Sequence, residues 1–169
     1  LHRQMGLRGG VVGDYFDDTL RASQAYCEEV GGHFLSPFDD QDVIEGQATV
    51  TYEMLEQLGR APDILILPVG GGGLSSSARR LLTERAPETE IFYVEPEGGK
   101  SLAAAVAAGE PTTITKVDNF VDGAAVARIG QHTFAALKGI DADHVLAIPE
   151  DRICTTILEM LNVEGVVLE

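Results

Sequence analysis

The chain has 169 residues, which is enough for a domain with its own hydrophobic core. Its formal net charge of −15 argues against nucleic acids and anionic membranes as partners, because both need clustered lysine and arginine. No run approaches about 18 consecutive apolar residues, and no basic-then-apolar signal segment opens the chain. We therefore predict a cytoplasmic protein that binds small molecules or other proteins.

Strand-like and helix-like segments alternate along the chain, which predicts an α/β fold with an open, mostly parallel sheet flanked by helices. Apolar residues at helical spacing predict helices over Asp17–Val30, Asp42–Leu58, Ala78–Ala86, Lys100–Ala108, Ile129–Leu137 and Asp151–Leu161. Short apolar runs predict strands over His33–Ser36, Asp63–Val69, Glu90–Val94, His144–Ile148 and Val166–Glu169. The last of these strands is interrupted by the end of the chain, so we expect a piece of a longer polypeptide.

Two of these elements carry expectations about packing. The strand at Asp63–Val69 is a continuous apolar run of the kind that parallel sheets bury on both faces. The helix at Asp42–Leu58 is expected to face the core with Val43, Val50, Met54 and Leu58.

Four consecutive glycines, Gly70 to Gly73, separate the strand at Asp63–Val69 from the next helix. Each glycine loses more backbone freedom on ordering than alanine would, at a cost of about 0.5–1 kcal/mol. One or two glycines would be enough for a tight strand-to-helix turn, so we expect a further function for the run. The usual one is an anion held by backbone N–H groups at a helix N-terminus. The run therefore predicts a phosphate site.

The neighbouring residues narrow the kind of phosphate ligand. No lysine follows the glycines, although the GxxxxGK[ST] loop of nucleoside triphosphate sites requires one. Glu95 lies about 20 residues on, where a dinucleotide site has its ribose partner, but Ser75 or Ser76 replaces the third glycine of that fingerprint. A single phosphate monoester is the favoured ligand, with a dinucleotide and a purely structural turn as alternatives.

Other candidate residues receive structural interpretations. The histidines and cysteines lack the spacing of metal ligands, so we predict no metal site. Both cysteines, Cys27 and Cys154, are interpreted as small buried apolar residues. Glu45 and Gln47 are candidate acid/base residues, but capping or flanking a helix beside Gly46 is the favoured interpretation. Glu95 and Glu97 are interpreted as loop residues at a strand end. Ser75 is the serine best placed to add a hydroxyl donor to the phosphate or to cap the helix.

Four motifs in order carry a resemblance to a known family: PFDDQDVIEGQATVTYEML, PVGGGGLSSS, FYVEPEGGKS and FVDGAAVARIG. They resemble the fold type II (tryptophan-synthase-β-like) pyridoxal phosphate enzymes, and among these the threonine dehydratases. The resemblance implies pyridoxal 5'-phosphate as cofactor, with its phosphate bound by Gly70, Gly71, Gly72, Gly73 and Leu74. It also implies that the segments 37–39 and 122–124 line or approach the cofactor cleft, with Gly123 as a cofactor neighbour or a turn glycine. Residues 1–30 would belong to a small domain and residues 31–169 to the large cofactor-binding domain.

For the complete protein, the resemblance implies conversion of L-threonine to 2-oxobutanoate and ammonia in isoleucine biosynthesis, by a homo-oligomer. The family's Schiff-base lysine lies in a motif like SFKxRGA, and none of Lys100, Lys116 and Lys138 has that context. We therefore assign no catalytic residue to this chain and expect it to be inactive alone. The alternatives are a serine dehydratase or racemase of the same fold, and a non-catalytic phosphate-binding or interaction module.

Overall fold

The computed structural model describes residues 10, 12–13 and 16–168 of the chain. The chain divides into two compact units, residues 1–35 and residues 36–169. The first unit contains helix α1 (Phe16–Val30), which ends where the sequence predicts, before Gly31 and Gly32. Among the residues that the structure describes, no helix is both long and apolar enough to cross a lipid bilayer.

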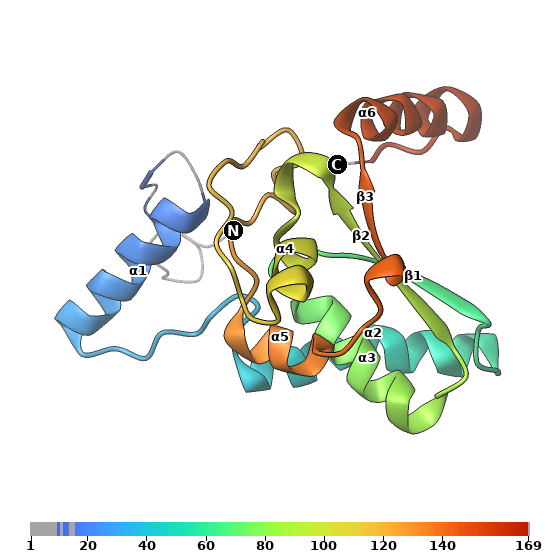
Figure 1. Ribbon diagram of the computed structural model, residues 1–169, viewed down its shortest axis with the longest axis horizontal. Coiled ribbons are helices and arrows are strands. Elements are labelled where there is room, and N and C mark those ends of the chain that lie inside the picture. Colours follow the sequence, from blue (N-terminus) through green and yellow to red (C-terminus); the bar gives the residue numbers. More distant parts are fainter. Residues whose placement is uncertain (1–9, 11, 14–15, 169) are drawn as a thin grey trace, which may run out of the picture. The chain divides into compact units, whose positions relative to one another are not determined.

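The second unit is built on a parallel sheet (Figure 1). Its strands are β1 (Ile64–Pro68), β2 (Glu90–Pro96) and β3 (Val145–Ile148), in the spatial order β1-β2-β3. Ile66 pairs with Phe92, and Val94 pairs with Leu146. Parallel neighbours need crossover connections, and helices supply them here. The predicted α/β fold with an open parallel sheet is confirmed.

The predicted helices are all present, with shifted ends. In the second unit they are α2 (Gln41–Leu58), α3 (Gly73–Arg85), α4 (Ser101–Ala108), α5 (Gln131–Leu137) and α6 (Glu150–Glu159), which continues as a π-helical turn over Met160–Glu164. Short 3-10 turns occupy Glu97–Gly99 and Ala142–His144.

Two strand predictions are wrong. His33–Ser36 and the described part of the last segment, residues 166–168, have no strand structure, while Glu169 lies outside the described residues. A β-strand exists only where a second strand takes its hydrogen bonds. Local residue preference therefore cannot create one by itself.

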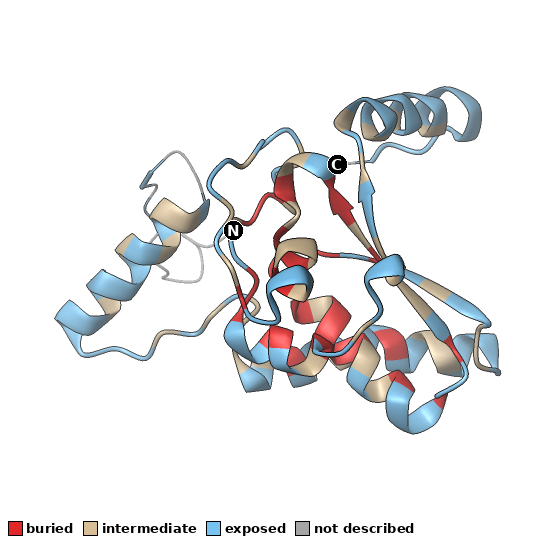
Figure 2. Cartoon of the chain, in the orientation of Figure 1, coloured by how far each residue is buried: buried red, intermediate tan, exposed pale blue. Residues whose placement is uncertain are grey.

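The core of the second unit lies between the sheet and helices α4 and α5. Val69, directly after β1, and Tyr93 of β2 form one cluster with Leu102 of α4 and with two residues of α5, Phe134 and Leu137, and each of the five is at most 4% exposed. In Figure 2 the buried parts of the chain, in red, gather beside the strands, whereas α6 has no buried residue. The glycine run lies at the edge of this core, directly after Val69.

Burial of β1 on both faces is a prediction that the structure contradicts. Leu67 is buried, but Ile64 and Ile66 are 53% and 65% exposed on the other face, and Leu146 of β3 is 40% exposed. The alternation follows from the pleat, which points successive side chains to opposite sides. In the described residues, helices cover one face of the β1 strand and leave the other open.

The core-facing side of α2 is also different from the prediction. Ile44 and Thr51 are buried, whereas Val50 and Leu58 are more than half exposed. Helix α2 packs against α3, and this contact buries the face that contains Ile44, which lies one residue after the predicted Val43. The helical period was predicted correctly, but its phase was not.

Candidate functional site

The glycine run joins the end of β1 to the start of α3. Gly72 is the N-cap residue of α3, with φ of +90°, a left-handed conformation that glycine adopts without the steric penalty of a side chain. Gly73 and Leu74 already belong to the helix, which therefore begins before the predicted residue Ala78. The run places a helix N-terminus at the edge of the core.

The amide groups of this loop are free of protein acceptors. No described residue accepts the N–H hydrogens of Gly70 through Leu74, and no side chain caps α3. Gly71, Gly72 and Gly73 are buried. A buried N–H group without a hydrogen-bond acceptor is energetically unfavourable, so these donors favour binding of an acceptor from outside the chain. An anion at the N-terminus of α3 would satisfy them.

Other helices of this unit have carboxylates at the corresponding place. Asp40 accepts a hydrogen bond from the Asp42 amide at 2.9 Å and caps α2. Glu95 accepts from the first turn of α4, and Asp39 accepts from the first turn of α5. The N-terminus of α3 has no such side chain, and its donors stay available for a ligand.

Packing supplies a second reason for the glycines. A Cβ on Gly71 would overlap the Phe38 ring, and one on Gly73 would lie 3.2 Å from the Phe38 Cβ. A Cβ on Gly70 would lie 3.2 Å from the Cα of Ala124. The assumption that one or two glycines are enough for the turn is therefore wrong. The number of glycines therefore does not indicate a ligand. The set of unpartnered amides is what indicates an anionic ligand.

We expect Gly71→Ala to destabilise the complete protein, free of any ligand, by about 1–3 kcal/mol, because the new methyl group must displace the Phe38 ring. Gly123→Ala is the matched control, since a Cβ there meets nothing within 4 Å and should change stability by less than about 0.5 kcal/mol. Urea titrations of both variants, and of Gly71→Ala combined with Phe38→Ala, measure the effect. Strict additivity of Gly71→Ala and Phe38→Ala would contradict the steric explanation.

Both segments expected near the cleft lie against the glycine loop. Phe38 of the 37–39 segment contacts Gly71 and Gly73, and Ala124 of the 122–124 segment contacts Gly70. Gly123 is exposed, and its carbonyl oxygen lies 3.5 Å from the Cβ position of Gly70. The structure thus brings together three segments that are distant in the sequence. Their contact with a cofactor stays a prediction.

The serines after the loop serve the backbone. Ser75 Oγ donates to the Pro68 carbonyl at 3.0 Å, Ser76 to Gly73 at 3.0 Å and Ser77 to Leu74 at 2.8 Å. The Ser75 hydroxyl hydrogen is therefore engaged with the end of β1. This bond ties the first turn of α3 to the strand and fixes the direction in which the helix leaves the loop.

Glu95 is not the loop residue that the sequence predicts. It lies in β2, is 1% exposed, and accepts hydrogen bonds from the Leu102 amide at 2.6 Å and the Ala103 amide at 2.9 Å. Burial raises the pKa of Glu95 to about 7, although these bonds and the charge of Lys100 oppose the shift. The carboxylate fastens α4 to the carboxyl end of the sheet. The neighbouring Glu97 is exposed in a 3-10 turn.

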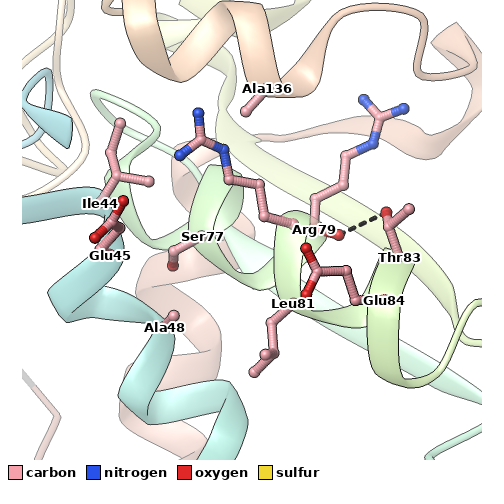
Figure 3. Close-up of a pocket in the computed structure, with 10 residues that line it drawn as sticks. Ile44, Glu45, Ala48, Ser77, Arg79, Leu81, Thr83, Glu84 and Ala136 are labelled. Carbon is pink, nitrogen blue, oxygen red and sulfur yellow. Dashed lines mark hydrogen bonds between the residues drawn. The ribbon is translucent and has the colours of Figure 1, made fainter. Parts of the chain in front are cut away.

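A separate groove of about 680 Å³ lies between α2, α3 and α5 (Figure 3). Glu45 of α2 and Arg79 and Glu84 of α3 line it, and the glycine loop does not. Glu45 and Gln47 are exposed residues within α2, and Asp40 rather than either of them caps that helix.

The described residues contain no group of three or more potential metal ligands. The expectation that both cysteines are buried is wrong: Cys27 is half-buried and Cys154 is exposed.

Comparisons with known proteins agree with this geometry. The biosynthetic L-threonine dehydratase IlvA of Bacillus subtilis is 42% identical over 159 residues, and that of Mycobacterium leprae is 43% identical over 155 residues. The matches cover 94% and 91% of this chain but 37% and 36% of the relatives, so the chain spans little more than a third of their length.

Solved structures show the same fold. The processed threonine deaminase isoform 2 of Solanum lycopersicum superposes with a TM-score of 0.88 at 33% identity, over 99% of this chain and 48% of that chain. Maize serine racemase superposes with a TM-score of 0.85 at 25% identity, over 99% and 52%. The predicted fold, the large domain of a fold type II enzyme, is confirmed.

The family described as "Pyridoxal-phosphate dependent enzyme" matches residues 2–169, almost the whole chain. Pyridoxal 5'-phosphate is accordingly the cofactor of this family, as the motifs predicted. The chain belongs to the family of pyridoxal-phosphate dependent enzymes.

Proposed function

We propose that this chain supplies the phosphate-binding part of the cofactor site in a threonine dehydratase. The observation that carries the proposal is the set of unpartnered amides from Gly70 to Leu74 at the N-terminus of α3. A phosphate monoester matches them, because its oxygens accept several hydrogen bonds and its charge interacts favourably with the helix dipole. The absence of a carboxylate at this helix end supports the same ligand.

The residues of this chain bind and orient the cofactor. The loop amides would hold the phosphate, while Phe38 and Ala124 pack against the loop and keep its backbone in place. When bound, pyridoxal 5'-phosphate supplies an electron sink for charge that develops at the substrate's α-carbon. No lysine of this chain has the context of the one that would move the α-proton, so the chain by itself is expected to be inactive.

The proposed reaction is the conversion of L-threonine to 2-oxobutanoate and ammonia, as part of isoleucine biosynthesis. The names of relatives at 42% and 43% identity support threonine as the substrate, and the 25% identity to maize serine racemase gives weaker support to the serine-specific alternative. The assignment of residues 1–30 to a small domain and 31–169 to the large domain belongs to the same proposal. A homo-oligomeric state and a cytoplasmic location stay predictions.

Steady-state kinetics of the complete enzyme test the substrate assignment. We expect kcat/KM for L-threonine to exceed that for L-serine by about tenfold or more, because a pocket shaped for the threonine methyl group gains binding energy from it. The assay detects the released keto acid, 2-oxobutanoate from threonine or pyruvate from serine, by reducing it in a coupled reaction. Equal turnover of both substrates, or racemisation of serine without keto-acid release, would favour the alternative. A complete protein without an SFKxRGA-like lysine would favour the non-catalytic module.

A further inference from the structure

The carbonyl group of Gly71 is held by helix α5. The Thr133 side chain is fully buried, and its Oγ1 donates to the Gly71 oxygen at 2.9 Å, with the Gly130 oxygen slightly farther away at 3.1 Å. The Gly130 amide also donates to the Gly71 oxygen at 3.4 Å. The hydroxyl of Thr133 therefore makes the shorter of the two contacts to this carbonyl.

This contact determines where the next amide points. The described residues contain no cis peptide bond, and in a trans peptide the C=O of one residue and the N–H of the next point in opposite directions. Because the Gly71 carbonyl points toward Thr133, the Gly72 N–H points away from α5. That amide is one of the unpartnered donors of the loop.

Asp39 fixes the first turn of α5, which carries Thr133. Its Oδ2 accepts from the Gln131 amide at 2.8 Å, and its Oδ1 accepts from the amides of His132 at 2.7 Å and Thr133 at 3.2 Å. A Cβ on Gly130 would overlap the Asp39 carboxyl group, so the fit is close. Phe38, the preceding residue, packs on the glycine loop itself. Asp39 therefore holds the helix that carries Thr133, and Phe38 packs on the loop that carries the Gly71 carbonyl.

We propose that Thr133 and Asp39 are positioning residues for cofactor phosphate, an inference that rests on the proposed function. Asp39 holds the N-terminus of α5, and Thr133 holds the Gly71 carbonyl so that the Gly72 N–H faces the phosphate. Neither side chain touches the ligand. Without the hydroxyl, the Gly71–Gly72 peptide keeps only the longer bond from the Gly130 amide, so its orientation is less restricted.

The test compares pyridoxal 5'-phosphate with pyridoxal, which lacks the phosphate, in titrations of the complete apoenzyme. We expect Thr133→Val to raise the Kd for pyridoxal 5'-phosphate about tenfold, the equivalent of one hydrogen bond, and to leave the Kd for pyridoxal within about twofold. Thr133→Ser, which keeps the hydroxyl, should bind like the wild type. Thr89→Val is the matched control, because Thr89 is also buried and donates to a backbone carbonyl, that of Pro62 at 2.7 Å, outside the loop.

The outcomes separate the two proposals. Equal weakening of both ligands, or of neither, in Thr133→Val would overturn the positioning role while leaving the phosphate loop in place. If Thr133→Val does not fold, Asp39→Asn decides, and the same selective loss of phosphate affinity is expected of it. If Leu74→Asp leaves phosphate affinity intact, the loop assignment itself fails.

Discussion

The complete enzyme carrying Leu74→Asp is expected to bind pyridoxal 5'-phosphate about 100-fold more weakly than the wild type. Leu74 is the second residue of α3 and is half-buried beside the unpartnered amides. A carboxylate there would compete for the same N–H groups and repel the phosphate dianion, as charges a few ångströms apart do. The helix itself gains from an acidic residue in its first turn, so the apoenzyme should stay folded.

Leu74→Asn separates charge from size in this experiment. Asparagine has nearly the same shape as aspartate but no charge, so its effect on cofactor affinity should be about tenfold or less. Absorbance titrations of the apoenzyme give both dissociation constants, and thermal unfolding of the apoenzyme checks the fold. Equal affinities of the Asp and Asn variants would place the phosphate elsewhere and remove the main support for the proposed function.

The second large effect concerns Glu95 and pH. Burial raises the pKa of Glu95 from 4.5 to about 7, so the folded protein binds this proton more tightly than the unfolded chain does. The contribution to stability is therefore complete below about pH 4.5 and is lost as the pH rises toward 7. We expect the wild type to lose about 2–3 kcal/mol of unfolding free energy from this group between pH 5 and 8.

Glu95→Gln should remove this pH dependence, because glutamine has no proton to lose. The measurement is the difference in unfolding free energy between wild type and variant, from urea titrations of the complete apoenzyme at several pH values. This difference cancels the titration of histidines that both proteins share. Glu97→Gln is the matched control, since Glu97 is exposed in a 3-10 turn. A constant difference between wild type and Glu95→Gln across the range would contradict the shift.

Glu95 also illustrates why the site was only partly predictable. Its position at the end of a strand favoured a loop interpretation, because local sequence shows neither burial nor distant hydrogen-bond donors. The side chain is buried because α4 folds back over the end of β2 and presents two amides to it. A carboxylate inside a protein needs such partners, and only the folded chain provides them.

The same division applies to Thr133. Nothing in the QHTFAAL segment distinguishes this threonine from an ordinary helical residue. Its partner Gly71 lies 62 residues earlier in the chain, and the contact exists because Asp39, from a third segment, anchors α5 beside the loop. No spacing rule within a single sequence relates three such segments. The resemblance indicated that residues 37–39 lie near the cleft, but not what they hold.

The sequence by itself determined the order of the helices and of β1, β2 and β3, and the parallel sheet, because these depend on local properties. The phosphate site at the glycine run stays a prediction. The period of the apolar residues distinguishes helix from strand. A glycine run after an apolar strand indicates that other protein groups or a ligand lie too close to the backbone for side chains to fit. Tertiary structure decided which faces became buried. Ile66 is as apolar as Leu67 yet stays exposed, and α2 faces the core with Ile44 rather than Val50. Burial depends on what packs against a residue, and that is a property of the assembled fold.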